Sequence, residues 1–402
     1  MKKLLSIMLV LVLALSMLTG CGTKDDGKDD GNNDAGNNAG SDAGSDNTAS
    51  GYEIALITDK GNIDDKSFNQ GSWEGVVKFA KENNITHNYY KPEEASDAGY
   101  LQAIELAITG GAKVVVTPGF LFEVPIYEAQ TLYPEVKFIL LDGSPRTTDY
   151  SDFTIKTNVA SIKYAEEESG YLAGYAAVKD GYKKLGFMGG MALPAVQAFG
   201  YGFLQGAQDA AKELGLADNE LSVIYHYTGN FDENDTNKAT AKTMYQEGTE
   251  VIFACGGSVG KSVMAAASEA GKKVIGVDTD QRYDSETVIT SATKGLGASV
   301  FQVLDAIYNT KTWETYAGTT TYFNAENDGV GLPTIVIGDA NANAFDRFAS
   351  FDKAAYDVVF KTLVDGTVDP IREITLADTN GYATAEELVN SLSLTKVAVE
   401  VR

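Results

Sequence analysis

Short apolar runs recur along the chain, and each is followed by a stretch whose apolar positions repeat at helical spacing. In the first half the runs cover residues 53–57, 114–117 and 138–141, and helices are expected over 69–83, 100–108 and 126–132. In the second half the runs cover 185–188, 223–225, 251–254 and 273–277, and a helix is expected over 199–214. Because continuous apolar runs suit strands buried on both faces, the alternation predicts an α/β fold. Two such series, on either side of a helix expected over 163–178, predict two doubly wound lobes with parallel sheets.

Glycine and acidic residues follow these runs, where parallel strands present their carboxyl ends. Ligands of open parallel sheets bind beyond those ends. Carboxylates suit the O–H and N–H donors of a ligand, and glycine lets a ligand approach the backbone. The residues concerned are Thr58, Asp59, Pro118, Gly119, Asp142, Gly143, Gly189, Gly190, Gly256, Gly257, Asp278, Thr279 and Asp280. The pattern predicts a cleft between the lobes that closes on a small molecule.

The first 20 residues have the pattern of an export signal. Lys2 and Lys3 precede an apolar run over residues 4–18, which is shorter than the ~20 residues that a membrane-spanning helix needs. The run ends in a segment that resembles a lipobox, with Cys21 as the lipidated cysteine of a bacterial lipoprotein. Residues 1–20 are therefore predicted to be a lipoprotein signal peptide, and the alternative is a cleaved signal with an incidental cysteine. Residues 21–50, rich in Gly, Asn and Asp, are predicted to form a disordered acidic linker.

Composition excludes several functional classes. The formal net charge of −24 argues against binding nucleic acid or anionic lipid head groups through a basic face. Cys255 is the one cysteine besides Cys21, so no internal disulfide is predicted. The two histidines, His87 and His226, lie far apart in the sequence and leave little material for a zinc site or a catalytic dyad. We predict neither a metal site nor a cofactor.

Several of the strand-end segments together resemble one family. The segment 58–75, which reads TDKGNIDDKSFNQGSWEG, resembles the opening signature of the BMP (basic membrane protein) family, the nucleoside-binding lipoproteins of ABC import systems. Further matching segments follow in order at 119–122, 166–174, 189–190, 199–203, 276–281 and 290–294. The resemblance is dense over residues 52–305 and thinner beyond them.

The resemblance implies a type I periplasmic-binding-protein fold with a purine nucleoside held between two lobes. On this basis the first lobe is expected to comprise residues 51–160 and 286–312, and the second 161–285 and 313–402. The implied partners are the nucleoside, the permease subunits of an ABC importer, and the membrane through the lipid anchor. The protein is thus expected to bind rather than to catalyse, at the outer side of the cell membrane.

The resemblance also implies roles for nine residues. Phe68 and Phe199 would sandwich the base, since stacking on aromatic rings tolerates any base. The polar groups near the base would be Asp59, Asn69 and Asp142, the ribose hydroxyls would meet Asp278 and Lys294, and the backbone would approach closely at Gly256 and Gly257.

Each of these residues has a simpler structural interpretation as well. Phe68 or Phe199 could belong to the hydrophobic core, and Lys294 could be a surface lysine at a helix start. Asp64 and Asp65 are favoured as caps of the helix that begins near residue 67. The run 166–168, three glutamates, is expected to be a solvated helix face or a docking surface for the permease.

Three other functions remain open from the sequence. The acidic segment 59–65 resembles the Asp-rich calcium motif of nucleoside hydrolases, although its spacing departs from that motif. The segment 255–262, CGGSVGKS, resembles a P-loop whose first glycine is replaced by Cys255. A binding protein for another small polar ligand, such as a sugar, is the third alternative.

Overall fold

The computed structural model describes residues 51–372 and 384–402. The predicted signal peptide, Cys21 and the whole of the predicted linker lie outside the described residues. Among the helices of the described part, none is long and apolar enough to cross a membrane.

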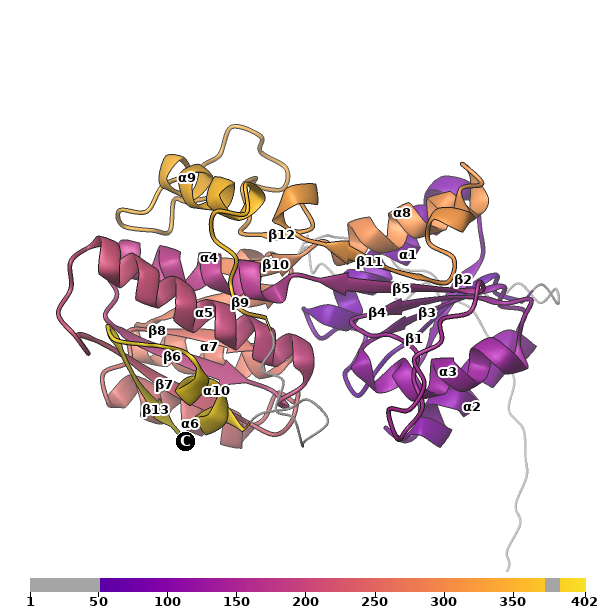
Figure 1. Cartoon of the computed structure of the whole chain (residues 1–402), viewed down its shortest axis with the longest axis horizontal. Coiled ribbons are helices and arrows are strands. Elements are labelled where there is room, and N and C mark those ends of the chain that lie inside the picture. The colour runs from indigo at the N-terminus through magenta and orange to yellow at the C-terminus, as the bar shows by residue number, and fades with distance from the viewer. Residues whose placement is uncertain (1–50, 373–383) are drawn as a thin grey trace, which may run out of the picture. The chain divides into compact units, whose positions relative to one another are not determined.

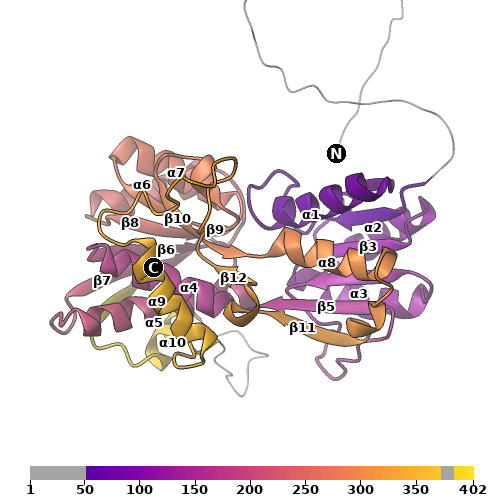
Figure 2. The same ribbon diagram turned by 90° about the horizontal axis from the view of Figure 1, so that it is seen from above.

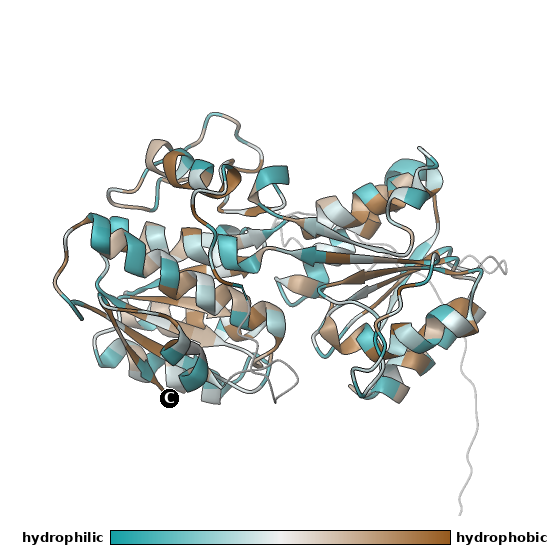
Figure 3. Cartoon of the chain, in the orientation of Figure 1, coloured by the Kyte–Doolittle hydropathy of each residue, from teal (hydrophilic) through white to brown (hydrophobic). Residues whose placement is uncertain are grey.

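The first sheet has six parallel strands in the order β11-β5-β4-β3-β1-β2 (Figure 1). Its strands are β1 (Ile54–Ile57), β2 (His87–Tyr90), β3 (Val114–Pro118), β4 (Lys137–Leu141), β5 (Val159–Tyr164) and β11 (Thr319–Phe323). The central strands are apolar and buried on both faces, as Figure 3 shows by their brown colour. One face packs against α1 (Phe68–Asn83) and α8 (Leu296–Tyr308), and the other against α2 (Asp97–Thr109) and α3 (Glu123–Leu132).

The second sheet has seven strands in the order β12-β10-β9-β8-β6-β7-β13, and all its pairs are parallel except β10 with β12. Its strands are β6 (Lys184–Gly189), β7 (Leu221–Tyr227), β8 (Val251–Cys255), β9 (Lys273–Asp278), β10 (Val288–Lys294), β12 (Val330–Gly331) and β13 (Val397–Val401). One face carries α4 (Glu166–Lys179) and α5 (Pro194–Glu213), and the other α6 (Asp235–Gln246) and α7 (Val259–Ala270). The C-terminal part adds α9 (Lys353–Val364), which contacts α4, and α10 (Ala385–Ser391), which contacts β7 and β13. The short 3-10 helices are η1 (Phe120–Phe122), η2 (Gln281–Tyr283), η3 (Trp313–Thr315) and η4 (Ala325–Asn327).

Helices α4 and α5 pack backbone against backbone through glycines. A Cβ atom added at Gly202 would lie 1.9 Å from the Glu167 carbonyl oxygen, and one at Gly170 would lie 2.2 Å from that of Phe199. Side chains larger than hydrogen would force the two helices apart. This contact fixes the position of Phe199 relative to the start of α4.

The chain crosses between the two sheets three times. It leaves the first sheet after β5, returns after β10 into α8 (Figure 2), and leaves again after β11. The crossovers are joined by backbone hydrogen bonds from Ala165 N–H to the Phe323 carbonyl and from Gly295 N–H to the Gly329 carbonyl. The end of β5 is therefore held to the end of β11, and the end of β10 to the segment that precedes β12.

The predicted fold class, two lobes with doubly wound parallel sheets, is confirmed. The helix expected over 163–178 is wrong at its start, because residues 163–164 belong to β5 and α4 begins at Glu166. Two strands also lie on the other side of the predicted lobe boundaries. β10, within 286–312, pairs with β9 in the second sheet, and β11, within 313–402, pairs with β5 in the first. The reason is that the crossovers follow these strands rather than precede them.

Candidate functional site

One cavity lies at the carboxyl ends of both sheets, and all nine predicted site residues line it. Its lining includes Asp59, Phe68, Asn69, Asp142, Phe199, Gly256, Gly257, Asp278 and Lys294. The space that no protein atom fills there is about 700 Å³, the part open to solvent included.

The loop before α1 builds the first wall of the cavity. The Asn69 side chain donates to Asp59 Oδ1 at 2.8 Å and to Asp65 Oδ2 at 2.9 Å, and its oxygen accepts from the Asp59 N–H. Asp59 Oδ1 also accepts from the Gly61 N–H at 2.7 Å. Both N–H bonds of the Asn69 amide are therefore used within the protein, and in this arrangement Asn69 orients Asp59.

Asp65 caps α1, as predicted. Its carboxylate accepts from the backbone N–H groups of Ser67, Asn69 and Gln70 at 2.9–3.1 Å. These are the N–H groups that a helix start leaves without partners. Asp64, favoured for the same role, is exposed, and among the described residues its carboxylate is not an acceptor at this helix start.

Burial sets the protonation of Asp59. It raises the pKa of Asp59 to about 6, against the opposing effect of the hydrogen bonds from Asn69 and Gly61. A carboxyl group of this kind is ionised at neutral pH and accepts hydrogen bonds, but it takes up a proton in mild acid.

The two phenylalanines come from different lobes. Phe68 is the first residue of α1, and Phe199 lies in the second turn of α5, not at a helix start as expected. Phe199 lines the cavity and also belongs to the core of the second lobe, as the alternative interpretation expected: it is 2% exposed and meets Phe253 edge-on at 5.9 Å between ring centroids. Phe203, one turn further on, is buried in the same core. The Lys294 ammonium lies 4.4 Å from the Phe68 ring centroid and 5.4 Å from that of Phe199.

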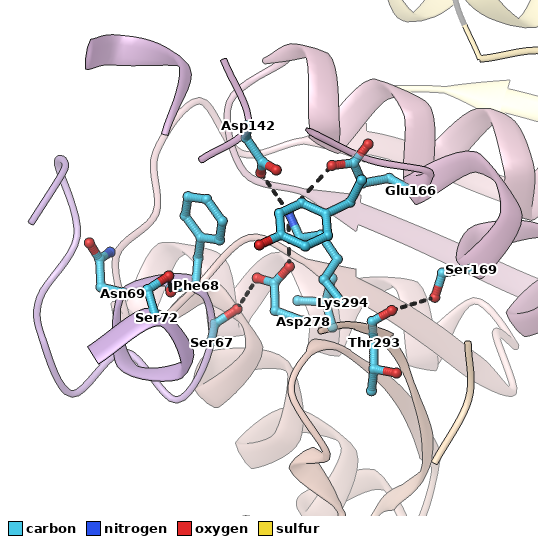
Figure 4. A network of polar contacts seen from close by, with 12 residues as sticks. Ser67, Phe68, Asn69, Ser72, Asp142, Glu166, Ser169, Asp278, Thr293 and Lys294 are labelled. Carbon is cyan, nitrogen blue, oxygen red and sulfur yellow. Dashed lines mark hydrogen bonds and ion pairs between the residues drawn. The ribbon is translucent and has the colours of Figure 1, made fainter. Parts of the chain in front are cut away.

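A buried lysine surrounded by carboxylates joins the two lobes (Figure 4). Lys294 Nζ lies 2.6 Å from Asp142 Oδ2, 3.4 Å from Asp278 Oδ1 and 3.6 Å from Glu166 Oε1. Ser67 Oγ, from the first lobe, donates to Asp278 Oδ2 at 2.5 Å. The Lys294 side chain is 2% exposed, so the interpretation as a surface lysine is wrong.

The acidic surroundings keep Lys294 charged. Burial alone would lower the pKa of Lys294, but Asp142, Asp278 and Glu166 outweigh it and raise that pKa above its ordinary value. Burial raises the pKa of Asp142, while Lys294 acts against that rise. Lys294 therefore presents an ammonium ion to the cavity beside the carboxyl groups of Asp142 and Asp278.

Asp142 and Asp278 share an unusual backbone conformation. Asp142 directly follows β4 with φ 54°, and Asp278 ends β9 with φ 65°. Aspartate tolerates this left-handed region better than most residues, and such strain gathers at functional sites. The same local geometry thus turns one carboxylate from each sheet into the cavity.

The glycines after β8 have a structural reason beside any ligand contact. A Cβ atom at Gly256 would lie 2.7 Å from the Gly190 backbone nitrogen, and Gly257 has φ +55°. In the same segment, Lys261 Nζ donates to the Asp64 carbonyl of the first lobe at 3.0 Å, and Ser262 Oγ bonds to the Asn234 backbone. The lysine and serine of the P-loop-like segment are thus engaged in contacts within the protein.

Sequence reasoning missed several residues at the site. Phe231 lines the cavity beyond β7, where the strand-end rule could have found it. Glu166, expected on a solvated face or a docking surface, is instead completely buried and paired with Lys294 and Arg372. No local signal in the sequence distinguishes a buried glutamate from a solvated one in a run of three.

Two doubly wound lobes, three crossovers and a cavity between strand ends are the architecture of the periplasmic-binding-protein fold. Solved structures agree with this fold. A solute-binding protein of an ABC transporter system from Aeropyrum pernix K1 has a TM-score of 0.68 and 22% identity, covering 82% of this chain and 95% of that one. A similar protein from Conexibacter woesei DSM 14684 has a TM-score of 0.60 and 22% identity, covering 80% and 99%.

Sequence comparisons give the family. Residues 53–358 match the sequence profile of the Bmp family, described as ABC transporter substrate-binding protein PnrA-like. The ABC transporter nucleoside-binding protein BmpA of Lactococcus lactis subsp. cremoris is 32% identical over 319 residues, 73% of this chain and 85% of that protein. Basic membrane protein D of Borreliella burgdorferi is 28% identical over 76% of this chain and 89% of its own length. The chain therefore belongs to the Bmp family, as predicted, and is a substrate-binding protein of an ABC transporter.

Proposed function

We propose that this protein binds purine nucleosides outside the cytoplasm and delivers them to the permease of an ABC importer, anchored to the membrane by lipid on Cys21. The observation that carries the proposal is that the nine residues proposed to hold the ligand line one cavity. The name of the relative from Lactococcus lactis, a nucleoside-binding protein, supports the same ligand class.

The cavity lining offers groups that suit both parts of a nucleoside. Phe68 and Phe199, from opposite lobes, offer ring faces for a base, and stacking is worth about 1–3 kcal/mol per base in nucleic-acid systems. Asp278 and Lys294 offer an acceptor and a donor side by side, which is what a pair of ribose hydroxyls requires. Asp59, oriented by Asn69, is an acceptor for an N–H group of the base.

The protein is proposed to bind its ligand without converting it. The acidic loop does not resemble a free set of metal ligands, because Asp59 Oδ1 and both Asp65 oxygens already accept hydrogen bonds from the protein. The hydrolase alternative is tested directly by incubating the protein with inosine and Ca²⁺ and measuring released hypoxanthine. Release of free base at a rate that rises with protein concentration would contradict the proposal.

The test of binding uses ligand-free protein comprising residues 51–402. Such protein is prepared by unfolding and refolding, and mass spectrometry verifies that no small molecule remains. Its melting temperature is then measured with adenosine, guanosine, inosine, uridine and ribose. A ligand at 100 times its Kd adds about 2.7 kcal/mol to the stability, so a purine nucleoside should raise the melting temperature clearly. A rise with ribose alone would favour the sugar alternative, and no rise with any nucleoside would refute the proposal.

A further inference from the structure

Arg372 lies at the first crossover between the lobes, beyond the residues that match the family profile. Its Nη1 is 2.7 Å from Glu166 Oε2 and 2.6 Å from Glu167 Oε2, and it donates to the Tyr164 carbonyl at 2.5 Å. The Arg372 side chain is only 22% exposed. An arginine from the C-terminal part of the chain thus reaches the junction of β5 and α4.

The backbone next to Arg372 is held in place by α5. The Gln205 side chain accepts from the Ile371 N–H at 2.8 Å and donates to the Ile371 carbonyl at 3.0 Å. Gln205 lies on the same helix as Phe199. The position of Arg372 is therefore fixed to the helix that supplies one wall of the cavity.

Glu166 stands between Arg372 and the lysine of the cavity. Its two oxygens face opposite cations: Oε2 faces Arg372 at 2.7 Å and Oε1 faces Lys294 at 3.6 Å. A buried charge without a partner is strongly destabilising. If Arg372 were absent, Glu166 would have Lys294 as its remaining close cation, in competition with Asp142.

We propose that Arg372 is a positioning residue of the ligand site: by pairing with Glu166, it leaves the Lys294 ammonium directed at Asp142 and Asp278, in the cavity. The inference rests on the proposed function, since it assigns Lys294 to the ligand. The protonation of Glu166 is consistent with it. Burial favours a raised pKa of Glu166, but Arg372 and Lys294 outweigh burial and hold that pKa below its usual value.

Several titratable groups face Glu166 and enter any titration of it. They are Arg372, Lys294, Asp142, Glu167, Tyr164 and Cys255. Glu167 is the useful comparison, because it pairs with Arg372 as Glu166 does. Unlike Glu166, it is not among the ion-pair partners of Lys294, which are Asp142, Glu166 and Asp278. Loss of the Glu166 charge and loss of the Glu167 charge should therefore have different effects on the cavity.

The first experiment measures inosine binding by calorimetry in the full chain. Arg372→Met should weaken binding at least about tenfold, since Lys294 is drawn toward Glu166. Adding Glu166→Gln should bring affinity back to within about threefold of the Glu166→Gln single variant, whereas adding Glu167→Gln should not. Arg402→Met is the matched control, because Arg402 also pairs with two glutamates, Glu247 and Glu400, and should leave binding unchanged.

The second experiment needs no ligand and compares the thermal unfolding of the wild type with that of Arg372→Met at pH 5.5 and pH 8. Without Arg372, only Lys294 among the two cations still opposes the effect of burial on Glu166, so the pKa of Glu166 should rise in the variant. Where that pKa exceeds the unfolded value, stability is lost as the pH rises through it. The deficit of the variant should therefore be larger at pH 8 than at pH 5.5. In the Glu166→Gln background this pH dependence should disappear.

The outcomes separate this inference from the proposed function. If the wild type binds no nucleoside, the proposed function fails, and the pH dependence alone decides the role of Arg372. A deficit that is equal at both pH values, or an affinity that Glu166→Gln fails to restore, overturns the inference and leaves Arg372 a merely structural residue. If Arg372→Met does not fold, the double variant with Glu166→Gln should fold, and its failure to fold also overturns the inference.

Discussion

Substitution of Asp278 by asparagine should reduce the preference of the protein for a nucleoside over its free base. Asparagine is chosen over alanine because position 278 has φ 65°, a conformation that asparagine tolerates and alanine does not. The change removes the negative charge that Lys294 faces at 3.4 Å and weakens the acceptor proposed for a ribose hydroxyl. Lys294 keeps Asp142 and Glu166 as partners, so the core of the charge cluster should persist.

The expected magnitude follows from the lost hydrogen bond. A hydrogen bond to a charged group contributes about 1.5–3 kcal/mol, which corresponds to roughly ten- to a hundredfold in affinity. Inosine should lose this amount and hypoxanthine, which has no ribose, should lose little. Calorimetry with both ligands on the wild type and on Asp278→Asn measures the difference.

A control is needed because Asp278 also joins the lobes. Its Oδ2 accepts from Ser67 Oγ across the cleft, so any change there disturbs closure as well. Ser67→Ala removes that contact and keeps the carboxylate, so it should weaken inosine and hypoxanthine by similar factors. If Asp278→Asn also weakens the two ligands equally, the assignment of Asp278 to the ribose is wrong.

Three further variants test separate parts of the structure. The wild type should become more stable when the pH falls from 7.5 to 5, because the pKa of Asp59 is raised to about 6 and its ionised form is unfavourable above that pH. Asp59→Asn should gain less stability over the same pH change. Melting curves of ligand-free protein at both pH values measure the two gains, and equal gains in variant and wild type would contradict the prediction. Gly202→Ala should lower the free energy of unfolding, measured by urea denaturation, by about 1–3 kcal/mol, because its Cβ would lie 1.9 Å from the Glu167 carbonyl oxygen. Gly297→Ala is the control: its Cβ would lie 3.4 Å from the nearest atom, so the free energy of unfolding should change little. Cys21→Ala in the full-length chain should release the protein from the membrane fraction and leave nucleoside binding intact. A variant that stays in the membrane fraction would refute the lipid anchor.

Much of the fold could be predicted because it is encoded locally. The apolar runs of β1, β3, β4, β8 and β9 are continuous, so a single window suffices to find them. β2 and β10 were not predicted, since β2 reads HNYY at the edge of its sheet and β10 contains Thr290, Ser291 and Thr293 among its apolar residues. Their strand conformation comes from pairing with neighbours, which is information that a local window lacks.

The same distinction applies to the cavity. Asp59, Phe68 and Asn69 lie in one long motif at a strand end, so the sequence places them together. The burial of Glu166 depends instead on Arg372, 206 residues further along the chain. A charged residue near the start of a helix is usually solvated, and only its distant partner makes burial acceptable. Local reasoning therefore finds residues that line the cavity more readily than the residues that support them.

The contacts between the lobes divide into two groups with different consequences for ligand binding. Outside the cavity, the Lys66 carbonyl accepts from Thr279 Oγ1 at 2.9 Å and from Gln281 Nε2 at 2.8 Å. Inside it, the contacts are Ser67 with Asp278 and Lys294 with Asp142, which use the groups proposed to hold the ligand.

A ligand shifts closure only through its different affinities for the open and closed states. The outer contacts at Lys66 form whatever the ligand, so they stabilise closure without selecting among ligands. If the ligand binds as proposed, its hydroxyl and N–H groups compete for Asp278 and Asp142, and the inner contacts are exchanged when it binds. A ligand that replaces all of these bonds keeps the protein in the closed state. A ligand that leaves Asp278 or Lys294 without a partner does not. Selectivity for a nucleoside over a free base should therefore arise at the inner contacts.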